Sequence, residues 1–217
     1  MSEQLRALMR LLTHSVVVCT STATAGPSQR PTPRAMTMSS FTSLALSPTP
    51  VVSFNVATPS RTLDAIRASG CFNVHVLKGG VAGARVADWF TQGNDQGHKV
   101  FEELSSCGVE LVGADSGEAA NQKSGLEPPV LKGVGVLYVI RCKLLDEPSG
   151  GLIPVRDHVI VLGEVVEIIE ASATKGIRGA NDCFGLIYAD RRYRQPGNTL
   201  IRSDSPQPGR PGSEVKD

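Results

Sequence analysis

A segment rich in small hydroxyl residues and methionines, RAMTMSSFTS over residues 34–43, is the first part of the chain suited to ligand chemistry. Side chains alternate along an extended strand, so Thr37 and Ser39 point to one face and Met36, Met38 and Ser40 to the other. Hydroxyls supply hydrogen bonds and methionine a polarizable surface, a combination that favours a flat heteroaromatic ligand. The alternative, favoured on these residues alone, is a half-exposed edge strand whose hydroxyls contact water.

A second segment, SFNVATPSRT over residues 53–62, combines two hydroxyls and a guanidinium at the expected start of a helix. A strand ends near Val56, Pro59 breaks it, and Ser60, Arg61 and Thr62 lead into the helix. A helix start offers unpaired N–H groups and a partial positive charge, so these three residues form a candidate phosphate site. The alternative is N-capping by Ser60 or Thr62, which explains the hydroxyls but not Arg61.

A third candidate is Arg156-Asp157-His158, at the start of a long expected strand. A histidine beside an acid can donate a hydrogen bond or handle a proton. The alternative is a turn histidine next to a turn aspartate, which is preferred in the absence of other evidence.

Other familiar chemistry is not indicated by the sequence. The remaining histidines and the five cysteines lack the spacing of metal ligands, and the thiols are expected in the core, so we predict no metal site. The nucleotide-binding patterns GxGxxG and GxxxxGK[ST] and the hydrolase pattern GxSxG are absent from the sequence.

The elements that would hold these residues are mostly strands. Apolar spacing predicts helices over 2–12, 62–69 and 83–90. Runs rich in β-branched residues predict strands over 15–20, 35–41, 51–56, 71–76, 134–145, 158–169 and 185–188. Because few helices separate these strands, we expect a mainly β fold, a closed or nearly closed antiparallel barrel with short helices at its rim, rather than a parallel doubly wound sheet.

One domain is expected over residues 1–202, followed by a disordered tail over 203–217. Residues 24–33 and 105–129 are predicted to be irregular. The chain has 217 residues with 22 basic and 21 acidic side chains, and this near-zero net charge argues against a nucleic-acid partner. No apolar run is long enough to cross a membrane, so no membrane partner is expected. A cytoplasmic location is predicted, with the mitochondrion as the alternative.

Taken together and in this order, the segments AMTMSSFTSLALSPTP, VVSFNVATPSRT, CFNVHVL, a Gly-Val-Leu strand and RDHVIVLGEV resemble the flavin reductase-like domain family. The resemblance runs from about residue 8 to residue 193. It implies an FMN-binding antiparallel split barrel that forms a homodimer and reduces flavin with NADH or NADPH. FMN is the expected cofactor, with FAD as the alternative.

The resemblance also implies roles for individual residues. Those implied to bind flavin are Thr37, Met38, Ser39, Ser40 and Asn55 for the ring, Ser60, Arg61 and Thr62 for the phosphate, Phe72 and Asn73 for the ribityl side, and Phe90 before a loop. His158 is implied to be the catalytic residue, on the face where nicotinamide or another substrate stacks.

The sequence departs from the family pattern at three places. Ser47-Pro48-Thr49-Pro50 stands where an acid and two prolines are usual, Arg156 replaces a common glycine, and residues 93–129 form a longer connection. The leading hypothesis is an NAD(P)H-dependent flavin reductase that can supply a partner monooxygenase. The alternatives are an oxidoreductase that retains FMN and acts on its own small organic substrate, and a flavin- or haem-binding module without catalysis.

Overall fold

The computed structural model describes residues 1–23, 31–91, 99–112, 127–171 and 184–197. The helices are α1 (Ser2–Met9), α2 (Arg61–Ser69), α3 (Val81–Trp89) and α4 (Lys99–Glu102), with short 3-10 turns η2 (Leu104–Cys107) and η3 (Ser149–Gly151). The strands are β1 (His14–Ser15), β2 (Val17–Ala23), β3 (Thr32–Met38), β4 (Thr42–Ala45), β5 (Val51–Ala57), β6 (Cys71–Leu77), β7 (Val109–Val112), β8 (Val130–Gly133), β9 (Val136–Leu144), β10 (Leu152–Val155), β11 (His158–Glu170), β12 (Ile187–Ala189) and β13 (Arg192–Arg194).

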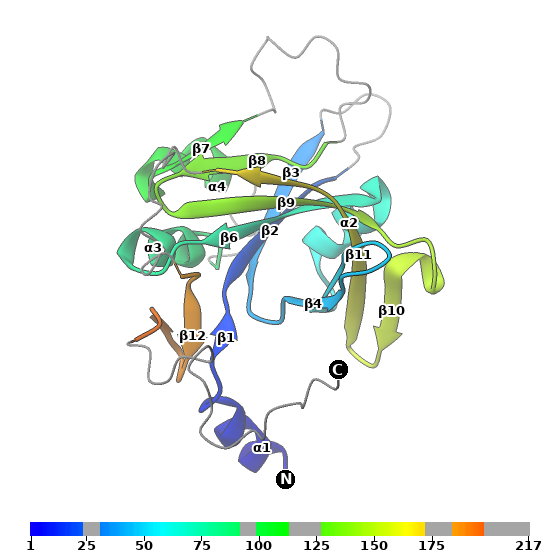
Figure 1. Ribbon diagram of the computed structural model, residues 1–217, viewed down its shortest axis with the longest axis horizontal. Helices are drawn as coiled ribbons and strands as arrows, with labels where there is room; N and C mark the ends of the chain where they lie inside the picture. The colour runs from blue at the N-terminus through cyan, green and yellow to red at the C-terminus, as the bar shows by residue number, and fades with distance from the viewer. Residues whose placement is uncertain (24–30, 92–98, 113–126, 172–183, 198–217) are drawn as a thin grey trace, which may run out of the picture.

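An antiparallel sheet of eight strands forms the centre of the molecule (Figure 1). Its hydrogen-bonded order is β3-β2-β6-β9-β11-β5-β4, and β10 pairs with the start of β11. Within the described residues the two edges, β3 and β4, do not pair with each other, so the sheet is not closed. The expected mainly antiparallel β fold with few helices is confirmed.

Two hydrophobic clusters pack on opposite faces of this sheet. Alternation along β2 and the residue before it explains the division, because Val16 and Val18 belong to one cluster while Val17 and Cys19 belong to the other. Helix α3 covers the first cluster and α2 the second. Since β2 and β6 have core on both faces, their side chains are buried whichever way they point.

Helix α2 forms where the sequence predicts a helix, and its ends explain why. The Ser60 hydroxyl accepts a hydrogen bond from the Leu63 N–H at 3.2 Å and caps the first turn. Gly70 ends the helix with a φ of 69°, a left-handed conformation that glycine adopts without steric cost. Leu63 and Ile66 are fully buried against the sheet. These contacts fix the position of the helix start and of Arg61.

The prediction that residues 105–129 are irregular is wrong for the beginning of this segment. Residues 104–107 form η2, and β7 then pairs with β8 in a small two-stranded sheet. The strand was missed because Val109 and Leu111 are separated by Glu110 in a segment too short to show a clear period. The residues 24–30 and 113–126 of the two predicted loops, and the predicted tail over 203–217, lie outside the described residues.

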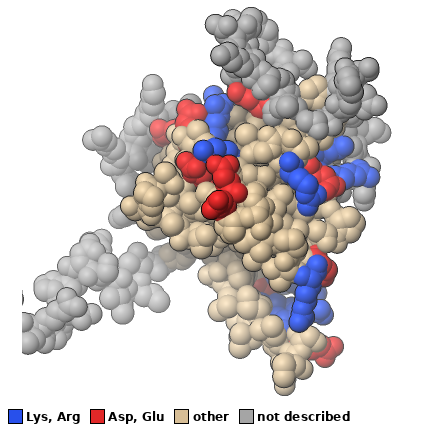
Figure 2. Space-filling view, turned by 90° about the vertical axis from the view of Figure 1, so that its right-hand side faces the viewer, with Lys and Arg blue, Asp and Glu red and all other residues tan. Residues whose placement is uncertain are grey.

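Charged side chains alternate in sign over the surface of the sheet. Arg141 pairs with Glu167 at 3.1 Å and Lys143 with Glu164 at 3.2 Å, between the neighbouring strands β9 and β11. On the face drawn in Figure 2, basic and acidic side chains lie side by side in a few small groups, separated by broad uncharged areas. None of the helices in the described part of the chain is long and apolar enough to cross a membrane.

His75 on β6 is a buried neutral histidine, and this makes stability depend on pH. Its Nδ1 donates to the Val18 carbonyl at 3.1 Å, and its Nε2 accepts from the Leu131 N–H at 3.0 Å. Burial lowers the pKa of His75 to about 4. Between this value and the pKa of about 6.5 in the unfolded chain, only the unfolded state gains the proton. The free energy of unfolding is therefore expected to fall as pH drops through this window, by at most about 1.4 kcal/mol per pH unit from this residue.

Urea unfolding at pH values spread over this window measures the slope. His75→Gln, which can still donate and accept, is expected to be less stable than the wild type but to show a shallower slope. An equal slope in the two proteins would contradict the assignment to His75.

Candidate active site

The register of β5 against β11 assembles a surface pocket of about 510 Å³. Ile160 lies opposite Asn55, and His158 lies opposite Ala57. Alternation along β5 buries Phe54 and Val56 and turns Ser53 and Asn55 toward the pocket. The residues that line it are Ser40, Ser53, Phe54, Asn55, Val155, Arg156, Asp157, His158 and Ile160. Three residues predicted from sequence, Ser40, Asn55 and His158, therefore share one pocket.

His158 is held at the edge of the pocket by its neighbour in the chain. Val155 pairs with His158, leaving Arg156 and Asp157 as the two-residue turn between β10 and β11. The His158 Nδ1 lies 2.9 Å from the Asp157 Oδ1. The hydrogen bond from His158 lowers the pKa of the Asp157 carboxyl, which keeps it ionised. An ionised carboxylate on Nδ1 orients the imidazole and leaves Nε2 for a ligand.

The turn that carries His158 is also fixed to the strand beside it. The Asp157 carbonyl accepts two hydrogen bonds from Thr58, from the N–H at 2.8 Å and from the hydroxyl at 3.1 Å. Arg156 has a φ of 54°, in the left-handed region where a side chain is disfavoured and glycine is usual in hairpin turns. The hydrogen bonds from Thr58 therefore hold the turn in place. They keep Arg156 at the edge of the pocket in a backbone conformation that is unfavourable for a residue with a side chain.

Ser40 continues the sheet at the point where β4 stops pairing with β5. Its hydroxyl donates to the Asn55 carbonyl at 3.2 Å and accepts from the Asn55 N–H at 3.1 Å. One side chain thus satisfies both backbone groups of Asn55 and leaves the Asn55 amide side chain exposed. Ser40 positions Asn55 in addition to lining the pocket.

The other predicted ring-binding residues have different surroundings. The Thr37 hydroxyl donates to the Ala87 carbonyl at 2.6 Å and attaches β3 to α3, while Met38 is buried in the core. Ser39 is exposed and lines a second cavity, which shares no lining residue with the pocket of His158. Of these residues, Ser39 and Ser40 offer accessible polar groups, whereas Thr37 and Met38 attach the preceding strand β3 to helix α3 and to the core.

A basic group forms at the start of α2, where the sequence predicts a phosphate site. Ser60 caps the helix, and the buried Thr62 directs its hydroxyl to the Ala35 carbonyl of β3 at 3.4 Å. Burial and then the charge of Arg61 lower the pKa of Arg34, so the two guanidiniums lie close enough to repel. Two neighbouring cations at a helix N-terminus favour an anion. Ser60 and Thr62 have structural tasks here, and the charge comes from Arg34 and Arg61.

Arg34 was not among the predicted site residues, although it begins the segment 34–43 that is rich in hydroxyls and methionines. Its signal is weak, because a lone arginine early in a strand is ordinary, and Arg61 lies 27 positions later in the chain. Arg156 and Asp157 were part of the candidate segment of His158, and Arg156 was also recognised as a departure from the family pattern, but neither was predicted to be a site residue. Ser53 and Ile160 carry no local signal, since their place in the pocket comes from strand pairing.

The last three residues predicted to bind flavin are buried in the core, away from this pocket. Phe72 is fully buried and packs edge-on against Phe54, with ring centroids 5.3 Å apart. Asn73 is buried and donates to the carbonyls of Pro128 and Pro129, and Phe90 is buried beside Phe101. Their roles in flavin binding stay predictions.

Thiols and metal ligands do not add to the site. Among the described residues, no group of three or more His, Cys, Asp and Glu side chains is arranged to hold a metal ion. Burial raises the pKa of Cys142 to about 12 and that of Cys19 further, so both thiols stay protonated. An unreactive protonated thiol fits the core role expected for these cysteines.

The fold and site together define a class: an antiparallel β protein with a partly polar pocket where β5 pairs with β11 and two neighbouring arginines at the start of α2. The sequence profile of the flavin reductase like domain matches residues 9–197, most of the chain. The protein therefore belongs to the flavin reductase-like domain family.

Individual relatives agree with this assignment. An NADH:FMN oxidoreductase from Rhodococcus qingshengii is 31% identical over 191 residues, which cover 88% of this chain and 80% of the relative. The NADH:FAD oxidoreductase SgcE6 of Streptomyces globisporus C-1027 shares the fold with a TM-score of 0.62 and 23% identity, over 91% of this chain and 94% of that one. Nitrilotriacetate monooxygenase component B from Mycobacterium thermoresistibile has a TM-score of 0.61 at 22% identity, over 94% and 93% of the two chains.

Proposed function

We propose that the protein is an NAD(P)H-dependent flavin reductase that passes hydride from a reduced nicotinamide to flavin. The observation that carries the proposal is the pairing of two sites along β3. The basic group of Arg34 and Arg61 lies at the start of this strand, and Ser39 and Ser40 follow its end. The curated relative named NADH:FMN oxidoreductase supports the same activity.

The residues present fit a phosphorylated flavin. Arg34 and Met38 are separated by about 13 Å of extended strand, so a ligand with a phosphate at one end and a planar ring at the other can lie along β3. Arg34, Arg61 and the N–H groups at the start of α2 would hold the phosphate. Ser40 and Asn55 would hold the polar edge of the ring by hydroxyl, amide and backbone groups, with the backbone of Ser39 beside them.

A bound flavin supplies the capacity to accept two electrons as hydride. The protein's own contribution is binding and orientation. Ser40 and the strand pairing fix Asn55, while the Asp157 carboxylate fixes the imidazole of His158. We assign to His158 the task of orienting the nicotinamide donor through a hydrogen bond from Nε2, at the edge of the same pocket.

Anaerobic stopped-flow absorbance tests the proposal. Flavin bound to the wild-type protein is expected to lose its visible absorbance on mixing with NADH or NADPH. If neither donor bleaches it, the protein is not a flavin reductase. A visible spectrum that responds to no reductant or substrate would instead favour a binding module without catalysis.

His158→Asn is expected to lower the second-order rate of flavin reduction about tenfold, the value of one hydrogen bond of about 1.4 kcal/mol. The dissociation constant for FMN is expected to stay within about twofold, because His158 orients the donor and not the flavin. Glu110→Gln, on an exposed position of β7, serves as the control. Equal losses of rate in the two variants would contradict the role of His158.

A second candidate function is an oxidoreductase that retains FMN and acts directly on a small organic substrate. Arg156 favours it, because a guanidinium in a disfavoured backbone conformation at the pocket edge suits an anionic substrate. Retention of FMN through extensive dilution, without turnover of free flavin, would select this function over the first.

We also propose a homodimer, with a monooxygenase as the acceptor of reduced flavin. Helix α1 has no buried residue, and Leu5, Leu8 and the following Leu11 are 59%, 56% and 79% exposed, so nothing in the described part of the chain covers the apolar side of this helix. Light scattering is expected to give twice the chain mass of 23.0 kDa. A mass of one chain would exclude the dimer. The relative that is a monooxygenase component supports the choice of acceptor.

A further inference from the structure

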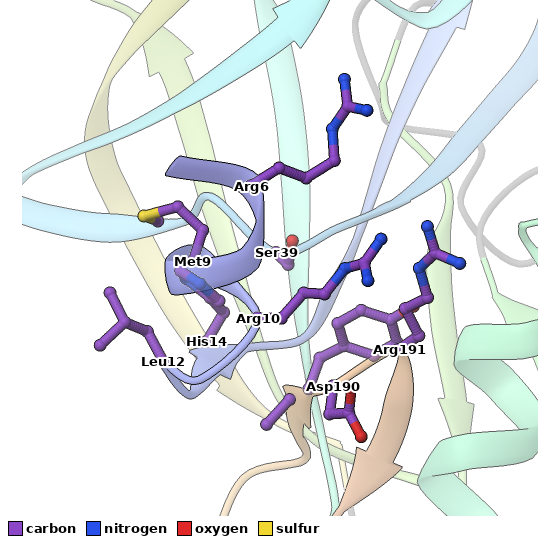
Figure 3. Close-up of a pocket in the computed structure, with 10 residues that line it drawn as sticks. Arg6, Met9, Arg10, Leu12, His14, Ser39, Asp190 and Arg191 are labelled. Atoms are coloured by element: carbon purple, nitrogen blue, oxygen red, sulfur yellow. The ribbon is translucent and has the colours of Figure 1, made fainter. Parts of the chain in front are cut away.

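A second cavity, of about 320 Å³, lies between α1 and the turn that joins β12 to β13 (Figure 3). It differs from the pocket of His158 in the charge of its lining. Three arginines line it: Arg6 of α1, Arg10 at the end of that helix and Arg191 of the turn. The volume of this arginine cavity is at the lower end of the range for ligand pockets, so the cavity fits a small molecule.

The three guanidiniums form no ion pair with an acid in the described part of the chain. Arg6 and Arg10 are four residues apart, so they share one face of α1. One acid, Asp190, also lines the cavity, and in Figure 3 its carboxylate points to the opposite side from the guanidiniums of Arg10 and Arg191. Three cations against one acid leave an excess of positive charge, which favours a ligand with more than one negative charge.

The turn that carries Arg191 is attached to the end of α1. Ala189 pairs with Arg192, which leaves Asp190 and Arg191 as the two-residue turn between β12 and β13. Their φ values of 49° and 58° lie in the left-handed region, where a side chain is disfavoured. The Asp190 N–H donates to the Arg10 carbonyl at 3.0 Å. This hydrogen bond holds the two arginine-bearing segments together in the free protein, so a ligand does not have to bring them together.

Part of the lining of the arginine cavity is apolar and aromatic. Met9 comes from α1, Leu12 follows that helix, and Tyr188 comes from β12. The Tyr188 ring packs on Tyr193 with centroids 5.5 Å apart, which fixes its orientation. An aromatic side chain packs favourably against a planar ring of a ligand. The cavity therefore combines cations for acid groups with apolar surface for a planar carbon skeleton.

We propose that the arginine cavity binds a small aromatic dicarboxylate, at a site separate from the pocket of His158. The two cavities have no lining residue in common, so the proposal goes beyond the reductase activity and does not depend on it. A carboxylate accepts two parallel hydrogen bonds from one guanidinium, so two carboxylates engage two of the three arginines. The ring between them packs against Tyr188. The leucines proposed to contact a second copy, Leu5 and Leu8, share a different face of α1, so the two proposals use different surfaces of this helix.

Isothermal titration calorimetry of the full-length protein with benzene-1,2-dicarboxylate tests the proposal. Benzoate keeps the ring with one carboxylate, and succinate keeps two carboxylates without the ring. Ionic strength is kept at about 0.15 M, because salt screens exposed charges.

The variants remove the cations of the cavity and leave the fold intact. They are Arg6→Gln with Arg10→Gln, and Arg191→Gln alone. Arg6 and Arg191 are exposed and Arg10 is half-buried, so these substitutions are expected to change stability little. Arg67→Gln, which breaks an exposed ion pair on α2, is the matched control. Thermal unfolding checks that each variant is folded.

We expect benzene-1,2-dicarboxylate to bind the wild type about tenfold more tightly than benzoate or succinate, since each of these lacks one half of the contacts. The double variant is expected to weaken its binding about tenfold and Arg191→Gln about threefold, while the control stays within about twofold. Saturating FMN is expected to leave the affinity of the wild type within about twofold.

Three results would overturn the proposal: no binding of the dicarboxylate, equal affinity in the wild type and the arginine variants, or an affinity for benzoate or succinate as high as that for the dicarboxylate. Competition by FMN would also overturn it, because the cavity would then belong to the flavin site. Failure of NADH and NADPH to bleach bound flavin would overturn only the proposed function.

Discussion

Replacing Arg34 and Arg61 together with glutamine is expected to weaken FMN binding by about two to three orders of magnitude. A charge-assisted hydrogen bond contributes about 1.5–3 kcal/mol, so two of them to one phosphate sum to about 3–6 kcal/mol. Because Arg34 is half-buried and Arg61 is exposed, screening by solvent places the expected loss at about 3–4 kcal/mol. Burial lowers the pKa of Arg34, and the neighbouring charge of Arg61 lowers it further, because two cations repel each other. A bound phosphate removes this repulsion, so the pair stabilises the complex more than the free protein.

The control for this variant is Arg67→Gln on the same helix, because Arg67 pairs only with Asp64 at an exposed position. Ser60 and Thr62 are best left unchanged, since Ser60 caps α2 and Thr62 is buried, and their loss would destabilise the helix that presents Arg61. Titration of intrinsic flavin fluorescence gives the dissociation constants. If the double variant binds FMN within about twofold of the wild type, Arg34 and Arg61 do not bind the flavin phosphate.

The elements were predictable where one stretch of chain contains all of the information. Helix α2 carries its own cap at Ser60, its own apolar face at Leu63 and Ile66, and its own terminator at Gly70. Strand β11 is a long run of β-branched residues. Strands β7 and β8 have four residues each and pair with each other. Four residues are too few for the alternation of apolar and polar side chains to be recognised in the sequence.

The site was predictable only in part, because its geometry depends on pairing between distant strands. His158 was a candidate from its own segment, and the resemblance supplied its role and added Asn55. The two share a pocket because β11 pairs antiparallel with β5 in one register. A shift of one residue would turn Asn55 into the core. Arg34 and Arg61 come together through the packing of α2 on β3, a tertiary contact that neither segment encodes alone.

Alternation along β6 shows why Phe72 and Asn73 were hard to assign. Because side chains alternate along a strand, Phe72 and Asn73 point to opposite faces of the sheet. When both faces are covered, the sequence does not show which face contacts a ligand and which contacts the core. Strand β6 lies between β2 and β9, and the structure buries both residues. A family motif on a central strand therefore identifies the strand more reliably than the function of each side chain.

Phe72→Ala is expected to lower the free energy of unfolding by about 4 kcal/mol, within the range for removing a fully buried aromatic ring. The ring packs edge-on against Phe54 and covers Gly163 of β11, where any Cβ would clash with it. Gly163 has no side chain to fill the space, so a cavity remains after the substitution. Urea unfolding measures the loss, and Phe184→Ala, whose ring is 51% exposed, is expected to cost less than about 1 kcal/mol.

Phe72→Leu separates a core role from the ribityl contact implied by the resemblance, because leucine keeps most of the buried volume and the variant stays folded. If Phe72 acts only in the core, this variant is less stable by about 1–2 kcal/mol and binds FMN as the wild type does. FMN affinity reduced about tenfold, at a small cost in stability, would show instead that flavin reaches this ring. Such a result would require β6 to open on one face when the ligand binds, because the Phe72 side chain has no accessible surface in the structure.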